Sequence, residues 1–198
     1  NAYGTYLKPP PKIDKLSPNV VVGICQWRSM FYDPAVRKQT LDLRKAWLDK
    51  MAPGNKLWIW GYYLHARPDA YGWESIPAVF PHLIAEDLRS LKGKSYGEFI
   101  ETYREHREDG WRTLATNHLN VYVTTRLYWN TERDLDAMLN EYYRLFYGPA
   151  QKEAKTFFEF CENNWNRMKS DVNAINTMFA LLEAAQQAAG DTVYATAR

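Results

Sequence analysis

Apolar runs that alternate with helix-like segments are the feature that most constrains the fold of this chain. Strand-like runs lie at residues 20–27 (VVVGICQW), 57–63 (LWIWGYY) and 96–101 (YGEFIE), and another lies at residues 3–7. The run at residues 20–27 is apolar on both faces, which is typical of a strand buried on both sides of a parallel sheet.

Helical patterns fill the intervals between the later runs. Residues 33–51 carry apolar side chains at roughly helical spacing and end before Pro53-Gly54, and a second helical stretch within residues 76–94 stops at Gly93. Strand, helix, strand, helix and strand in this order predict βα units with parallel strands, and hence an α/β fold. Four such strands form either an open sheet or about half of a (β/α)8 TIM-type barrel, which typically needs ~250 residues.

The second half of the chain is predicted to be all helical. Apolar periodicity predicts helices at about residues 111–127, 135–146, 150–168 and 171–189. Thr131 is the expected N-cap of the second of these helices. We expect Tyr122, Leu127 and Phe146 to be buried. The expected domains are a half-barrel over residues 1–130 and a helical extension over residues 131–198.

Composition excludes several functional classes. A formal net charge of +2 without a run of Lys or Arg gives no case for nucleic-acid binding. No stretch approaches 18 apolar residues, so no membrane-spanning segment is expected. The four His residues show no metal-ligand spacing, and there is no phosphate-binding Gly loop, so no metal or cofactor is expected. Cys25 and Cys161 are expected to be buried thiols rather than a disulfide.

The order of these motifs resembles the DUF4838 family over nearly the whole chain. The resemblance rests on AYGTYLKPP, PNVVVGICQW, LWIWGYY, FPHLIAEDLRSLK, GEFIE and LNVYVTTRLYWNTERDLDAMLNEYYRLFYGPA. It implies a bacterial, secreted or periplasmic protein with a glycoside-hydrolase-like barrel similar to those of α-glucuronidases and hexosaminidases. The chain would then be the carboxyl-terminal half of that barrel followed by a helical extension. It departs from the family at Gly61, where related sequences often carry an acid.

Two carboxylates are candidates for glycoside hydrolysis, which generally uses one acid and one nucleophile or base. Glu101 ends the strand at residues 96–101, and ligands of parallel α/β folds gather at the carboxyl ends of strands. Strand alternation places Phe99 and Glu101 on one face and Glu98 on the other. Asp69, in the loop after residues 57–63, is a candidate partner, and an acid contributed by the other half of the barrel is the alternative. The structural alternatives are an ion pair of Glu101 with Arg104, and a turn stabilised by Asp69.

Aromatic residues make up 15% of the chain, with 8 Trp and 14 Tyr, and they gather at strand ends. Such rings present a flat apolar surface with a polar handle, which suits a sugar. Arg28 is suited to hold a carboxylate, as in a uronic acid. The predicted substrate-binding residues are Trp27, Arg28, Trp60, Tyr62, His65 and Glu74. Trp58 is expected to pack in the core instead.

The sequence thus predicts a carbohydrate-active protein, with a glycoside hydrolase as the leading hypothesis. A non-catalytic glycan-binding protein on a degenerate hydrolase barrel is the alternative, motivated by Gly61. The expected partners are a carbohydrate and either the remainder of the chain or a second chain, because the strands of a half-barrel need partners to complete the sheet.

Overall fold

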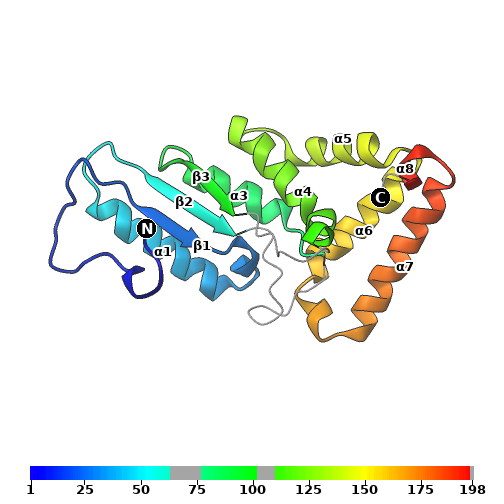
Figure 1. The fold of residues 1–198 in the computed structure, drawn as a ribbon, viewed down its shortest axis with the longest axis horizontal. Coiled ribbons are helices and arrows are strands. Elements are labelled where there is room, and N and C mark those ends of the chain that lie inside the picture. The colour runs from blue at the N-terminus through cyan, green and yellow to red at the C-terminus, as the bar shows by residue number, and fades with distance from the viewer. Residues whose placement is uncertain (63–76, 102–109, 197–198) are drawn as a thin grey trace. The chain divides into compact units, whose positions relative to one another are not determined.

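The computed structural model describes residues 1–62, 77–101 and 110–196, except for the side chains of residues 101, 110–117, 195 and 196. The chain forms two compact units (Figure 1). The first comprises Asn1–His65 and Glu86–Arg104, and the second comprises Ala66–Ala85 and Glu105–Arg198. The boundary expected near residue 130 stays a prediction.

A parallel sheet forms the centre of the first unit. Within the described residues it has three strands in the order β1 (Gly23–Gln26), β2 (Leu57–Tyr62) and β3 (Ser95–Glu101). The register places Cys25 beside Trp60 and Trp60 beside Phe99. The predicted α/β class and the parallel direction are therefore confirmed.

Two helices connect these strands. Helix α1 (Pro34–Lys50) follows β1, and α3 (Pro81–Leu91) follows β2. The Asp33 carboxylate caps α1 by accepting a hydrogen bond from the Ala35 N–H at 2.8 Å, and Pro34 occupies the first helical position.

One face of the sheet packs against these helices in a hydrophobic core. Ile24, Leu57 and Ile59 are fully buried there, together with Trp47 of α1 and Leu91 of α3. Burying each large aliphatic side chain contributes roughly 2 kcal/mol to stability. This core therefore fixes α1 and the end of α3 on the same face of the sheet.

The strand predicted at residues 3–7 is wrong. Only Ala2 pairs with the sheet, through a bridge in which its N–H donates to the Gly23 carbonyl at 2.6 Å. A 3-10 helix, η1 (Gly4–Tyr6), follows at once, because Gly4 takes a φ of 55° that an extended strand does not allow. The run at residues 20–27 is likewise strand only from Gly23 to Gln26.

Helices build the described part of the second unit. They are α4 (Gly110–Trp129), α5 (Leu135–Tyr147), α6 (Gln151–Asn164), α7 (Val172–Ala189) and α8 (Val193–Thr196). Short 3-10 segments are η2 (Arg28–Tyr32) in the first unit and η3 (Gly148–Ala150) and η4 (Arg167–Lys169) in the second. Helices α6 and α7 pack side by side (Figure 1). The four long helices expected here are confirmed.

A buried, hydrogen-bonded amide joins two segments of the second unit. Asn120 of α4 is completely buried, accepts a hydrogen bond from the Phe80 N–H at 2.9 Å and donates one to the Ala78 carbonyl at 2.8 Å. Trp165, 2% exposed, lies against Phe80 with ring centroids 6.0 Å apart. Because the buried amide of Asn120 both accepts and donates a hydrogen bond, it holds residues 78–80 against α4 without the cost of a buried unpaired polar group.

Two local predictions for the helical region are wrong. Asp134, not Thr131, caps α5, because its carboxylate accepts a hydrogen bond from the Ala137 N–H at 3.0 Å. Phe146 is 49% exposed, since α5 buries Tyr142, Tyr143 and Tyr147 on its inner face instead. Leu127 is buried as predicted, and Tyr122 is half-buried.

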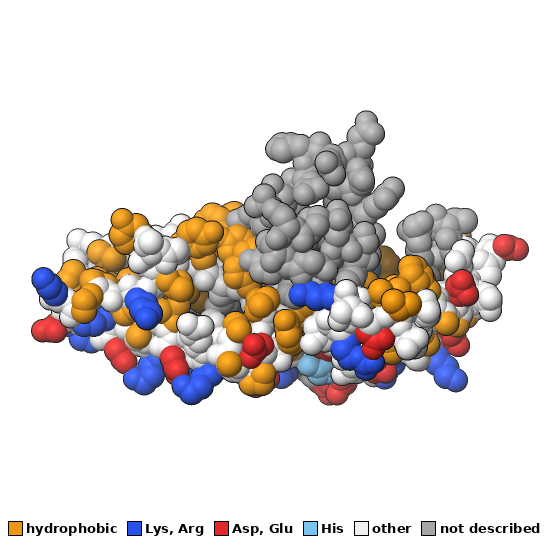
Figure 2. All heavy atoms as spheres, turned by 90° about the horizontal axis from the view of Figure 1, so that it is seen from below, with side chains coloured by type: hydrophobic (Ala, Val, Ile, Leu, Met, Phe, Trp, Pro, Cys, Tyr) orange, Lys and Arg blue, Asp and Glu red, His pale blue; other side chains and the backbone are white. Residues whose placement is uncertain are grey.

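The other face of the sheet carries aromatic side chains. In β2, Trp58, Trp60 and Tyr62 alternate with buried residues, so they share this face. Trp58 is 44% exposed and Phe99 of β3 is 52% exposed, so the expected core packing of Trp58 is wrong. In Figure 2 the part of the molecule that holds the first unit shows hydrophobic side chains along one edge and charged side chains along the opposite edge.

Exposed aromatic rings beside the edge strand β3 should make this chain associate. We expect the purified chain to elute from gel filtration as an oligomer or aggregate. Phe99→Lys should shift it toward monomer by placing a charge on that face. Val193→Lys, at a 74% exposed apolar side chain of the second unit, is the matched control and should leave association unchanged. A soluble wild-type monomer with a cooperative melt would contradict the prediction.

Candidate functional site

Two ring pairs define the aromatic face of the sheet. Trp27, directly after β1, stacks on Tyr62 at the end of β2, with centroids 4.1 Å apart and an interplanar angle of 19°. Trp60 and Phe99 lie side by side on β2 and β3, with centroids 4.2 Å apart. The structure thus brings three predicted substrate-binding aromatics, Trp27, Trp60 and Tyr62, onto one face.

A small cavity lies at the amino end of this face. Its volume is about 230 Å³, and its walls are Asn1, Val21, Gly23, Trp58, Ile59, Trp60 and Phe99. Gly97 makes room for the Trp58 indole, because a Cβ at position 97 would lie 3.3 Å from that ring. Its φ of 145° also favours glycine.

Glu101 is the last residue of β3, as predicted, and its Cα lies beside that of Tyr62 in the register. Its side chain lies outside the described residues. The expected alternation is nevertheless visible in its neighbours. Phe99 is on the exposed aromatic face, whereas the Glu98 side chain is 2% exposed and turned to the opposite face. His65, Asp69 and Glu74 also lie outside the described residues, so their predicted roles stay predictions.

Arg28 belongs to a buried ion cluster on the face covered by α1 and α3. It is fully buried, and its Nε donates to Oδ2 of Asp87 at 2.5 Å. Its terminal nitrogens Nη1 and Nη2 each donate to one oxygen of the Glu98 carboxylate, with Nη1 2.6 Å from Oε2. A bidentate guanidinium–carboxylate pair of this kind is among the strongest side-chain interactions. Arg28 therefore binds carboxylates of its own chain, and its contact with a substrate stays a prediction.

Arg44 of α1 completes the cluster. Its Nη1 donates to Oδ1 of Asp87 at 2.6 Å, and its Nε donates to Oε1 of Gln26 at 2.9 Å. Two guanidinium groups and two carboxylates make the cluster neutral, which offsets the large cost of burying each charge. Burial alone would raise the pKa of Asp87, but Arg28 and Arg44 outweigh it and hold that pKa at about 2.

Sequence reasoning missed Arg44, Asp87 and Glu98 as members of this cluster, although a signal was present. Arg44 lies three residues before the buried Trp47, and Asp87 lies three residues after the buried Ile84. Each is thus a charge on the apolar face of its helix. A buried charge is rare unless it is paired, so two such positions on neighbouring helices indicate an ionic partner.

Metal chemistry has no support among the residues that the structure describes. They contain no group of three or more His, Cys, Asp or Glu side chains able to hold an ion. Cys161 is a buried thiol, as predicted, and burial raises its pKa to about 12. Cys25 is a thiol that is only partly buried.

These features define an α/β protein with parallel βα units followed by a helical region. Residues 1–159 match the family described as a domain of unknown function, DUF4838. The chain belongs to this family, as its motifs predict. No curated protein and no solved structure matches the chain. None of the helices in the described ranges is long and apolar enough to cross a membrane.

The ion cluster should make the stability of the protein depend strongly on Asp87. Asp87→Asn leaves two buried guanidinium groups undercompensated and should lower the free energy of unfolding by about 3–5 kcal/mol, measured by urea denaturation at neutral pH. Asp42→Asn breaks only an exposed pair with Lys38 and should cost less than about 1 kcal/mol.

The same experiment at low pH tests the ionisation of Asp87. Because its folded pKa of about 2 lies below the ordinary value of 3.8, the folded state binds fewer protons than the unfolded state. This contribution is present above pH ~4 and is lost as the pH falls to ~2, by roughly 2 kcal/mol. Asp87→Asn should lack this part of the acid dependence. An equal acid dependence in both proteins would contradict the assignment.

Proposed function

We propose that the chain is a carbohydrate-active protein that hydrolyses glycosidic bonds in a polysaccharide or oligosaccharide. In this proposal its sheet forms about half of a (β/α)8-type barrel. The observation that carries the proposal is the row of aromatic rings that runs along one face of the sheet to the level of Glu101. Enzymes with such barrels build their sites at the carboxyl ends of the strands, where Glu101 lies.

The carboxyl end of the aromatic row is the better sugar site. Trp58 and Tyr62 are four residues apart on β2, which corresponds to ~13 Å along the strand. The stacked pair of Trp27 and Tyr62 lies at the carboxyl end, and Tyr62 is the register neighbour of Glu101. Trp58 belongs to the amino half, where side chains fill the interior of a closed barrel. A sugar ring would therefore stack against Trp27 and Tyr62.

The proposed reaction uses Glu101 as the general acid. Its carboxyl proton passes to the leaving oxygen as the bond from that oxygen to the anomeric carbon breaks. If this carboxyl group lay against the rings of Trp27 and Tyr62, the apolar environment would raise its pKa and keep it protonated near neutral pH. Asp69 is the proposed partner, as a nucleophile ~5–5.5 Å away or as a base for water ~6.5–9.5 Å away.

The alternative is a glycan-binding protein without catalysis. Gly61 motivated it, because an acid often stands at that position in related sequences. Gly61 is buried and alternates with Trp60 and Tyr62, so position 61 belongs to the face covered by α1 and α3. An acid there would lie on the side of the ion cluster rather than among the aromatic rings. The loss of that acid therefore leaves the proposed sugar surface unchanged.

Stacking on the aromatic pair predicts a specific loss of affinity. Trp27→Ala removes half of the ring pair and should weaken binding of oligosaccharides by roughly tenfold, measured by isothermal titration calorimetry. Tyr6→Ala, at a 78% exposed ring of the same unit, is the matched control and should bind as the wild type does. Equal affinity in Trp27→Ala and the wild type would remove Trp27 from the site.

Glu101→Gln separates the hydrolase from the binding protein. On a panel of aryl glycosides and plant or host glycans, a hydrolase should lose roughly 10²- to 10⁴-fold in kcat, because the amide cannot donate the proton. Affinity for the glycan should stay nearly unchanged in either case. Turnover that survives the substitution would exclude Glu101 as the acid, and neither turnover nor binding in the wild type would reject the proposed function.

A further inference from the structure

Trp27, one of the two stacked rings of the proposed sugar site, lies just beyond the end of the sheet. The last registered pair of β1 and β2 joins Gln26 to Gly61, so the strand register stops one residue before Trp27. Its backbone is nevertheless extended, with a φ of −117° and a ψ of 94°, and its carbonyl accepts a hydrogen bond from the Met30 N–H at 3.0 Å. The register of the sheet therefore does not by itself fix where the Trp27 ring lies.

The two sequence neighbours of Trp27 are anchored on the face covered by α1 and α3. Gln26 is 3% exposed, and its Oε1 accepts a hydrogen bond from Nε of Arg44 at 2.9 Å. Arg28 is fully buried and donates to both oxygens of Glu98. Successive side chains of an extended backbone point to opposite faces. Anchoring the side chains of residues 26 and 28 behind the sheet therefore directs the Trp27 ring to the aromatic face.

Arg28 binds two separate elements with one planar group. Its Nε donates to Oδ2 of Asp87 on α3 at 2.5 Å, and its Nη1 donates to Oε2 of Glu98 on β3 at 2.6 Å. Its Nη2 donates to the other Glu98 oxygen, so all three guanidinium nitrogens are engaged. Contacts in several directions fix the orientation of a rigid group, and lysine, a point charge, cannot reproduce them. The backbone next to Trp27 is held in place by this arrangement.

We infer that Arg28 is a positioning residue of the proposed sugar site and holds Trp27 in its stack on Tyr62 before a sugar binds. The inference rests on the proposed function for the ligand and on the ion cluster for the geometry. The two rings lie with centroids 4.1 Å apart and an interplanar angle of 19°. A surface that is already ordered binds more tightly, because less side-chain freedom is lost on binding. Arg28 acts here through Trp27 rather than by contact with the sugar.

The first test follows the Trp27 ring without any ligand. The chain has 8 Trp, and fluorotryptophan labelling makes each of them visible by fluorine NMR. The Trp27 resonance is the one absent from Trp27→Ala. Arg28→Lys should shift or broaden this resonance, because the ring loses its fixed place against Tyr62. A Trp27 resonance that is the same in Arg28→Lys and the wild type would overturn the inference.

The second test measures the affinity for oligosaccharides by isothermal titration calorimetry. Arg28→Lys should weaken binding by roughly threefold to tenfold, the range expected when one more side chain must be ordered on binding. Glu98→Gln removes the charge of one partner while keeping its shape, and it should act in the same direction. It replaces Arg28→Lys if circular dichroism shows that the latter does not fold. A shifted Trp27 resonance with wild-type affinity would also overturn the inference.

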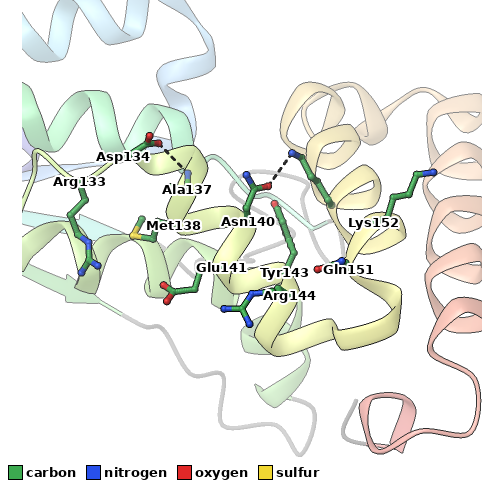
Figure 3. Close-up of a pocket in the computed structure, with 11 residues that line it drawn as sticks. Arg133, Asp134, Ala137, Met138, Asn140, Glu141, Tyr143, Arg144, Gln151 and Lys152 are labelled. Atoms are coloured by element: carbon green, nitrogen blue, oxygen red, sulfur yellow. Dashed lines mark hydrogen bonds between the residues drawn. The ribbon is translucent and has the colours of Figure 1, made fainter.

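Two controls separate positioning from lost stability and from the loss of any arginine. Leu91→Ala removes a core side chain at the end of α3, just before β3 begins, and so at the opposite end of the sheet from Trp27. It should lower the melting temperature but leave the Trp27 resonance and the affinity unchanged. Arg144→Lys changes an exposed arginine that lines an open groove of α5 and α6 (Figure 3) and should alter none of the three.

The outcomes distinguish this inference from the proposed function. Leu91→Ala that weakens binding as much as Arg28→Lys would overturn the inference, because lost stability would then explain both. Absence of sugar binding in the wild type would reject the proposed function and any role of Arg28 in a sugar site, whereas the resonance would still show whether Arg28 fixes Trp27. A changed resonance and weaker binding in Arg28→Lys, with neither in the controls, supports the inference.

Discussion

The first unit depends on the buried cluster of Arg28, Arg44, Asp87 and Glu98. Its members come from the segment after β1, from α1, from α3 and from β3, so one set of ionic contacts joins all the elements around the sheet. Burying each charge is compatible with a stable fold only because its ionic partners are in place, since an unpaired buried charge lowers stability by several kcal/mol. The cluster therefore specifies how these elements meet, in addition to the apolar core that drives them together.

The cluster also separates the two faces of the sheet. Residues alternate along β3, so directing Glu98 toward the helices directs Phe99 to the opposite face. The same alternation in β2 puts Ile59 in the core and Trp60 among the rings. The ionic and apolar contacts on the face covered by α1 and α3 therefore determine which side chains lie on the aromatic face. The proposed sugar site is in this sense a consequence of the packing behind it.

The second unit is stabilised by more local contacts. Helices α5 and α7 begin at the side-chain caps Asp134 and Asp171, and each buries one apolar face. Within this unit, Asn120 and Trp165 hold residues 78–80 through hydrogen bonds and ring packing. Helix α5 buries Tyr142, Tyr143 and Tyr147 and leaves Arg144 exposed on its outer side.

The sequence alone determined the α/β class, the parallel strands, the long helices and the family, because periodicity and motif order are local along the chain. It also put Phe99 and Glu98 on opposite faces, since strand alternation is a fixed property of the backbone. Only the tertiary structure decided that Arg28 is buried against Asp87 and Glu98, 59 and 70 residues away. It also decided that residues 4–6 leave the sheet and that Phe146 points outward. These outcomes depend on which distant side chains compete for the same buried space, and no local pattern encodes that competition.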